Sequence, residues 1–292
     1  MHNNKQHLSC LRLPISLPLL VSLISFSALL STHTFAQRDD ASDNIPTSNK
    51  YQPTIAIIID DLGNLIQRDT RAVRLPGAVT LAFLPQTPHA NELAQLAHRL
   101  NKEVMLHLPM ESMQGQQLGP GGLTLDMTAI QLAKQLQLDL DSVPHVVGVN
   151  NHMGSLLTQH PGHMQWLMQE LRNRNNLYFV DSYTTETSIA QQLATENWIP
   201  NLRRDVFLDH DRNPDRIRFH LRRLIKKAKK NGLALAIGHP FPETMAVLEQ
   251  ELPKLQAQGV RLLPVSQLVR QTLEESKSWQ AYLSHSHKVV RN

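Results

Sequence analysis

The chain has 292 residues, of which 41% are hydrophobic and 18% are charged, and its formal net charge is +4. This balance is typical of a globular protein with one large or two small domains, and it does not indicate a membrane protein overall. Because the basic excess is small, we expect no nucleic-acid partner. The only cysteine, Cys10, lies near the N-terminus, so a chain that loses this region has no disulfide, no cysteine nucleophile and no cysteine-ligated zinc.

The N-terminus has the pattern of a secretory signal peptide. Lys5 and Arg12 precede an apolar stretch over about residues 13–30, and small residues stand at −3 and −1 before a cleavage site after Ala36. Cleavage there lowers the formal charge from +4 to +2, places the protein in the periplasm or outside the cell, and leaves no stable membrane span. The alternative is an uncleaved inner-membrane anchor, because the stretch is nearly long enough to cross a bilayer.

Strand-like and helix-like segments alternate after this region. We expect a signal peptide over 1–36, a flexible lead-in over 37–52, one domain over 53–275 and a polar tail over 276–292. Strands are predicted at 54–59, 78–84, 103–108, 146–149, 177–180, 233–237 and 260–263, with a short extended piece near 199–202. Helices are predicted at 89–100, 128–140, 162–173, 188–197, 215–231, 244–258 and 265–275. Short strand–helix connections predict a parallel α/β fold, either a barrel-like sheet or an open doubly wound one.

Polar residues with ligand or proton-transfer chemistry collect where the predicted strands end. In chain order they are Asp60 and Asp61, His107 and Glu111, then Asn150, Asn151, His152 and Ser155, then Asp181, and finally His239. Because the C-terminal ends of parallel strands share one rim, residues far apart in sequence can converge there. The segment with Arg204, Asp205 and Asp209 predicts an ion pair and a cap near that rim, with substrate contact as the alternative.

The adjacent carboxylates of Asp60 and Asp61 repel each other unless a cation, a proton or strong donors offset the repulsion. The simpler interpretation is an aspartate N-cap with a solvated neighbour. Histidines and carboxylates without thiolates suit Zn²⁺ or a similar divalent metal, which lowers the pKa of bound water and polarises a carbonyl. A second carboxylate can take the proton of the water, and a histidine across the site can protonate the leaving group.

Several motifs resemble those of the divergent polysaccharide deacetylase family, a distant branch of the NodB-like carbohydrate esterases. They are Ile57-Ile58-Ile59-Asp60-Asp61-Leu62-Gly63, Leu106-His107-Leu108-Pro109-Met110-Glu111, Gly148-Val149-Asn150-Asn151-His152-Met153-Gly154-Ser155, Phe179-Val180-Asp181-Ser182, Arg204-Asp205-Val206-Phe207-Leu208-Asp209 and Ala236-Ile237-Gly238-His239-Pro240. The resemblance covers about residues 52–272. It implies a distorted (β/α) barrel of about seven parallel strands and metal-dependent removal of N- or O-acetyl groups from a glycan.

The resemblance also implies roles for single residues. Asp60 matches the base of the family and Asp61 a metal ligand, while His239 matches the general acid. The second metal motif reads His107-x-x-x-Glu111 instead of His-x-x-x-His, so either Glu111 or His152 is expected to complete the metal site.

The other expected site residues would orient ligands or contact the substrate, and they are Asn150, Asn151, Ser155, Asp181, Arg204 and Asp205. The changed second motif motivates an alternative, a catalytically impaired module that binds a glycan or the cell envelope. The sequence does not indicate an oligomeric state.

Overall fold

The computed structural model describes residues 52–174 and 177–274. The predicted signal peptide, almost all of the lead-in and the polar tail lie outside these residues. No helix in the described part combines the length and the apolar character that crossing a membrane requires.

One parallel sheet forms the centre of the described chain. Its strands are β1 (Thr54–Leu62), β2 (Thr80–Phe83), β3 (Glu103–Met110), β4 (Val146–Met153), β5 (Tyr178–Asp181), β6 (Asn201–Arg203), β7 (Val206–Phe207), β8 (Leu233–Gly238) and β9 (Arg261–Leu262). They pair in the order β6-β5-β4-β3-β2-β1-β8-β7, and β9 pairs with β1. Each pairing is parallel, as the strand–helix alternation predicts.

The sheet curls into a half-barrel, so the distorted (β/α) barrel implied by the resemblance is confirmed. Two consecutive residues bond to the strands next to its two edges: the N–H of Arg204 donates to the Asp181 carbonyl of β5, at 3.0 Å, and the N–H of Asp205 donates to the Leu235 carbonyl of β8, at 2.9 Å. The segment between β6 and β7 therefore links opposite sides of the curled sheet, and residues on it lie at the same rim as the ends of β5 and β8.

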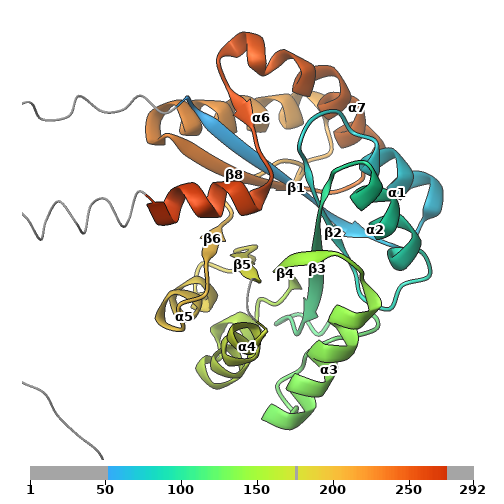
Figure 1. The fold of residues 1–292 in the computed structure, drawn as a ribbon, viewed down its shortest axis with the longest axis vertical. Helices are drawn as coiled ribbons and strands as arrows, with labels where there is room; N and C mark the ends of the chain where they lie inside the picture. Colours follow the sequence, from blue (N-terminus) through green and yellow to red (C-terminus); the bar gives the residue numbers. More distant parts are fainter. Residues whose placement is uncertain (1–51, 175–176, 275–292) are drawn as a thin grey trace, which may run out of the picture. The chain divides into compact units, whose positions relative to one another are not determined.

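Helices surround the strands (Figure 1). They are α1 (Ile66–Val73), α2 (Ala90–Arg99), α3 (Ala129–Ser142), α4 (Pro161–Asn173), α5 (Ala190–Glu196), α6 (Pro214–Asn231) and α7 (Pro242–Glu251), with 3₁₀ turns at Leu157–Gln159, Leu252–Lys254 and Gln256–Gln258. The alternation along β1 shows the two layers: Ile55, Ile57 and Ile59 pack in the cluster shared with the helices, whereas Ala56 and Ile58 belong to a second cluster inside the barrel. Both faces of β1 are thus buried, as its continuous apolar run predicts.

A last helix over residues 265–274, red in Figure 1, closes the inner cluster at the N-terminal ends of the strands. Val265, Leu268 and Val269 pack inside the barrel. The first turn of this helix is tied to two strand starts, because the Val265 N–H donates to Thr80 Oγ1 and the Ser266 N–H donates to Glu103. This end of the barrel is therefore filled, and the opposite end holds the strand termini with the polar residues.

The close packing of the inner layer requires a glycine in β4. A Cβ on Gly148 would lie 2.3 Å from the ring of Tyr178, which is nearly fully buried in the inner cluster. The Tyr178 hydroxyl donates to Glu103 at 2.8 Å, so the ring is held beside the closing helix.

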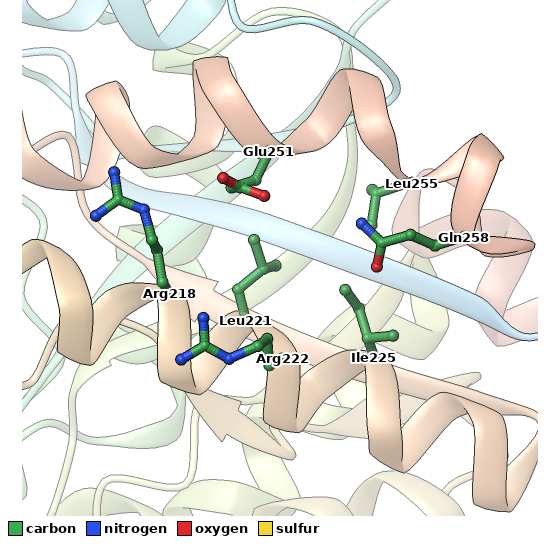
Figure 2. Close-up of a pocket in the computed structure, with 7 residues that line it drawn as sticks. All are labelled: Arg218, Leu221, Arg222, Ile225, Glu251, Leu255 and Gln258. Atoms are coloured by element: carbon green, nitrogen blue, oxygen red, sulfur yellow. The ribbon is translucent and has the colours of Figure 1, made fainter.

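On the outside of the barrel, α6 packs against α7 and the turns after it (Figure 2). Leu221, Ile225 and Leu255 are buried between them, beside a small cavity of about 150 Å³ edged by Arg218 and Arg222. None of these residues lies at the ends of the strands.

Two elements were not predicted from the sequence. The helix α1 has only eight residues, most of them polar, and β7 has only two, so both are too short for the windows in which periodicity predicts an element. The strands β1, β3 and β4 also extend past their predicted ends, so that Asp60 and Asn150 lie within strands rather than after them.

Candidate active site

The two carboxylates at the end of β1 both enter one pocket, although neighbouring side chains of a regular strand point to opposite faces. Asp61 has a φ of 60°, in the left-handed region, and the pairing of β1 with β2 shifts register between Ile59 and Leu62. This local break in the strand turns the Asp61 side chain toward the side on which Asp60 lies. For a residue other than glycine such a conformation costs about 1–3 kcal/mol and is common at functional sites.

The start of α1 supports this strained turn. The carboxylate of Asp69 accepts from the N–H groups of Gly63, at 2.8 Å, and Leu65, at 3.1 Å. Arg68 forms an ion pair with Asp69 and donates to the Asp61 carbonyl at 2.9 Å. Asp69 is fully buried, so this brace holds the backbone of Asp61 in place from inside the fold.

Three potential ligand atoms meet above the turn. Asp61 Oδ1 lies 3.1 Å from His107 Nε2 and 3.0 Å from His152 Nδ1, and the two nitrogens are 3.1 Å apart. Around a tetrahedral zinc with bonds of about 2.0–2.1 Å, ligand atoms stand roughly 3.3 Å from one another, close to this spacing. Asp61 Oδ1 is buried and has no hydrogen-bond partner in the described chain, which fits an atom reserved for a cation.

Asn150 determines which ring nitrogen of His107 faces Asp61 and His152. Its amide Nδ2 donates to Asp60 Oδ1 at 2.9 Å, so its Oδ1 is the acceptor that meets His107 Nδ1 at 3.0 Å. His107 therefore carries a proton on Nδ1, and the neutral ring presents the lone pair of Nε2 toward Asp61 and His152. A lone pair that faces a carboxylate and a second imidazole needs a cation between them, so the donor set fits a divalent metal.

Asp60 is nearly fully buried beside the ligand atoms. Its Oδ2 lies 3.6 Å from His107 Nε2, and its Oδ1 accepts from Asn150. Burial raises the pKa of both adjacent carboxylates, but contact with the His107 and His152 rings reverses this for Asp61. The pKa of Asp60 is raised and that of Asp61 is lowered, so the two neighbours are suited to different tasks, proton transfer and metal binding.

Across the pocket, His239 is held by Asp209. The His239 N–H donates to Asp209 Oδ2, at 2.6 Å, and the ring Nδ1 lies 3.0 Å from Asp209 Oδ1. Thr244 also donates a hydrogen bond to Asp209, so both oxygens of this buried carboxylate have hydrogen-bond partners. Burial lowers the pKa of His239, but the hydrogen bond and charge of Asp209, with Asp61 and Asp60, outweigh it and raise this pKa to about 9.

The pocket has a volume of about 410 Å³. It brings together seven residues expected from the sequence, namely Asp60, Asp61, His107, Asn151, His152, Arg204 and His239. Asn150 lies beneath them, fully buried, and links Asp60 to His107. Asn151 lines the pocket and holds its wall, because its amide accepts from the Ser182 N–H and donates to the Met153 carbonyl.

Four expected site residues lie elsewhere. Glu111 accepts from the Leu125 N–H at 2.7 Å and is outside the Asp61, His107 and His152 group. Ser155 bonds to the neighbouring loop at Met113 and Gln114. Asp181 accepts from Tyr183 and Ser188, and Asp205 accepts from Leu235 and pairs with Lys227. These four side chains support the fold around the rim instead of facing the pocket.

Other pocket residues were missed by the sequence analysis, and they are Met153, Ser182, Tyr183, Thr184, Phe207, His210 and Ile237. The role of Asp209 behind His239 was also missed, since the two-residue strand before Asp209 gives no periodic signal. The Asn151-His152-Met153 and Asp181-Ser182-Tyr183 segments repeat the feature seen at Asp61. Met153 has a φ of 54° and Tyr183 a φ of 52°, so left-handed residues lie at or within two residues of the ends of β1, β4 and β5.

Comparisons with known proteins agree with this geometry. The family described as divergent polysaccharide deacetylase matches residues 57–269. A protein of Escherichia coli (strain K12) called uncharacterized protein YibQ is 39% identical over 196 residues, which are 67% of this chain. The chain spans 61% of the length of that relative. An uncharacterized protein of Haemophilus influenzae is 33% identical over 219 residues, which are 75% of this chain and 78% of that protein.

A solved structure has the same fold. The crystal structure of uncharacterized protein ATU2773 from Agrobacterium tumefaciens C58 superimposes with a TM-score of 0.72 at 25% sequence identity, covering 76% of this chain and 92% of that one. The family match extends from β1 to the helix that closes the barrel and includes each residue of the Asp61, His107 and His152 group. The chain belongs to the divergent polysaccharide deacetylase family.

Proposed function

We propose that this protein is a metal-dependent hydrolase that removes acetyl groups from a glycan. The observation that carries the proposal is the convergence of Asp61 Oδ1, His107 Nε2 and His152 Nδ1 within about 3 Å of one another, beside a second carboxylate and an imidazole held by a buried aspartate. Zn²⁺ is the proposed metal, because one carboxylate and two imidazoles leave room for water or substrate.

A divalent cation at this site supplies Lewis acidity, which makes water a stronger acid and an acyl carbonyl a stronger electrophile. Asp60 then acts as the general base, because its Oδ2 lies beside the ligand group and its raised pKa favours proton uptake. Asn150 holds the other oxygen of Asp60, so the carboxylate cannot rotate away from the pocket.

His239 supplies the proton for the leaving group. With Nδ1 bonded to Asp209 and a pKa of about 9, the ring is doubly protonated at neutral pH and carries a proton on Nε2. His239 Nε2 lies 3.9 Å from Asp61 Oδ2, on the pocket side, where a departing amine or alcohol would stand. Base and acid are thus separate groups, and both lie near the ligand atoms.

The test combines metal analysis with acetate release. The purified protein should contain one zinc or similar metal ion and should release acetate from an acetylated oligosaccharide. Asp61→Ala should lose both properties while its circular dichroism spectrum stays unchanged. The matched control is Glu111→Gln, which keeps an acceptor for the Leu125 N–H and should retain metal and activity. Metal loss in Glu111→Gln, or a metal-free wild type after zinc reconstitution, would contradict the proposal.

The alternative function is a glycan- or envelope-binding module without catalysis. It was motivated by glutamate at position 111, where the related esterases have a metal-binding histidine. His152 lies beside Asp61 and His107, so three potential ligand atoms meet without Glu111, which supports the enzyme. A protein that binds zinc and glycan but releases no acetate from any acetylated probe would favour the binding module.

We also propose that the protein works in the periplasm or outside the cell after cleavage behind Ala36. The basic and apolar pattern of the first 36 residues supports this. N-terminal sequencing of the protein from fractionated cells should find Gln37 first, whereas Met1 on membrane-bound protein would indicate the uncleaved anchor.

A further inference from the structure

The proposed mechanism leaves one cation in the pocket without a task. Arg204 follows β6 and lines the pocket together with Asp60 and His239. Its Nε donates to the Ser182 carbonyl, at 2.6 Å, and its Nη2 donates to the Tyr183 carbonyl, at 2.8 Å. These two bonds fix the guanidinium from behind, at the strained end of β5.

The charge of this guanidinium has no close counterion. Carbonyl oxygens are neutral, and no described carboxylate forms an ion pair with Arg204. Asp60 is already engaged with Asn150 and His107, and Asp181 accepts from Tyr183 and Ser188. Burial lowers the pKa of the Arg204 guanidinium, while the more distant charges of Asp60 and Asp181 raise it. The Arg204 guanidinium is therefore partly removed from water, and no described carboxylate contacts it in return.

The free part of the guanidinium is available to a ligand. Nη1 donates to no described residue, whereas Nε and Nη2 are used by the backbone. The guanidinium carbon lies 4.9 Å from the centre of the Phe207 ring, which also lines the pocket and attracts the cation. A fixed, partly desolvated guanidinium at a pocket wall is the arrangement that recognises carboxylates and phosphates in proteins.

We propose that Arg204 binds an anionic group, a carboxylate or a phosphate, on the sugar unit that carries the acetyl group. The preferred substrate is then an acidic acetylated glycan rather than a neutral one. This inference rests on the proposed deacetylation, because it assigns the substrate class of the same pocket.

The neighbouring Arg203 provides a matched control. It is exposed, its guanidinium lies 4.3 Å from the centre of the Tyr183 ring, and it does not line the pocket. The two arginines differ by one position in the chain, so they share the overall charge of the segment but not the contact with the pocket.

The experiment compares acidic and neutral forms of one compound. The first pair is a disaccharide containing N-acetylmuramic acid, with a free carboxylate, and its methyl ester. The second pair is an N-acetylglucosamine disaccharide with and without a 6-phosphate. For the zinc-loaded wild type, kcat/KM for acetate release should be about 10- to 100-fold higher for one acidic form than for its neutral partner, the range expected for a charge-assisted hydrogen bond. The pair that shows the preference identifies the anion.

The variants separate recognition from folding. Arg204→Ala should lower kcat/KM for the acidic form only, so that kcat/KM for the acidic and neutral probes agrees within about 3-fold. Arg204→Lys should keep part of the preference, because it keeps the charge but not the planar fork. Arg203→Ala should behave like the wild type. If Arg204 only supported the fold, Arg204→Ala would lower kcat/KM for the acidic and the neutral forms alike, and that result would overturn the proposal. A wild type with equal kcat/KM for both forms would also overturn it.

Calorimetric binding of the same probes keeps the two proposals apart. If no probe releases acetate, the proposed deacetylation fails, but tighter binding of an acidic probe that is lost in Arg204→Ala still supports the anion site. If acetate is released and neither acidic probe binds more tightly than its neutral partner, deacetylation stands and the anion site is refuted.

Discussion

Among single residues, Asn150 and Asp209 give the site its chemistry without being ligands or proton-transfer groups themselves. Asn150 uses both ends of one amide, accepting from His107 and donating to Asp60, and so links a proposed metal ligand to the proposed base. Asp209 bonds to both the backbone and the ring of His239. Such partners behind the reacting groups fix tautomers and orientation, and their loss commonly costs 10- to 100-fold in affinity or activity, roughly.

The acid role of His239 predicts how activity depends on pH. A general acid works only when protonated, so the alkaline limb of kcat/KM should fall as the pH rises through the His239 pKa of about 9. In Asp209→Asn the group that raises this pKa loses its charge, so the limb should move to lower pH, toward the ordinary histidine value of about 6.5. The measurement is a pH profile of acetate release for both proteins, with zinc saturating at each pH.

The control for this profile is Asp211→Asn, which changes an exposed carboxylate two positions away. It should leave the alkaline limb where it is in the wild type. A limb that does not move in Asp209→Asn would show that another group donates the proton.

The sequence predicted the chemically distinctive residues of the site better than the backbone that aims them. Asp60, Asp61, His107 and His239 stood out because rare residue types followed apolar runs. The left-handed conformations of Asp61, Met153 and Tyr183 could not be predicted, since methionine and tyrosine rarely adopt them and an aspartate after an apolar run does not by itself indicate one. They depend on tertiary contacts, such as the Asp69 carboxylate bonded to Gly63, that connect residues through the fold.

At the scale of secondary structure, long apolar elements were predictable and short polar ones were not. The strand β1 contains a continuous apolar run, and the helix α6 repeats apolar residues at helical spacing over 18 residues. The helix α1 has only 8 residues and is largely polar, yet it carries the Arg68 and Asp69 brace. The site therefore relies partly on an element whose stability comes from tertiary contacts rather than from its own sequence pattern.

The helix α3 contains a buried charge that predicts a pH dependence of stability. Asp139 accepts at Oδ1 from Gln86 and Gln135, but its Oδ2 is buried without a partner. Burial raises the pKa of Asp139 to about 6, above the unfolded value of about 4. Because the folded pKa is the higher one, stability is fully present below about pH 4 and is lost as the pH rises through about 6.

The size of this loss follows from the shift. Two pKa units correspond to about 3 kcal/mol, so the free energy of unfolding should fall by up to about that amount between pH 4 and 7 through this residue. Asp139→Asn cannot ionise and should lack this part of the pH dependence, whereas Asp141→Asn, on the exposed side of the same helix, should keep it. Urea unfolding at pH 4, 5, 6 and 7 measures the difference, and parallel curves for the wild type and Asp139→Asn would contradict the prediction.

In the molecule as a whole, the two ends of the barrel have different tasks. The C-terminal ends of the strands carry the proposed metal ligands, base and acid, and they include the strained residues. The N-terminal ends are closed by the helix over 265–274, whose apolar side chains complete the inner cluster. Because strained residues at the site lower stability, the packed end has to offset them.

This division predicts that packing at the closed end can be weakened without changing the site. Leu268 is fully buried inside the barrel, whereas Leu273 of the same helix is 39% exposed. Leu268→Ala should lower the free energy of unfolding by about 2–5 kcal/mol, the usual cost of such a cavity. Leu273→Ala should change it by less than about 0.5 kcal/mol. Urea unfolding of the two variants measures this difference.

Zinc titration below the unfolding transition then tests whether the two ends are independent. The affinity of folded Leu268→Ala for zinc should equal that of the wild type and of Leu273→Ala, because no ligand contacts the closing helix in the described chain. A tenfold weaker zinc affinity in Leu268→Ala alone would contradict this. It would mean that the cavity shifts the inner residues Ile58, Met105 and Ile237. Each of these stands two positions before a site residue in the chain, so its movement would displace the site. In that case the inner cluster would set the geometry of the metal site as well as the stability of the barrel.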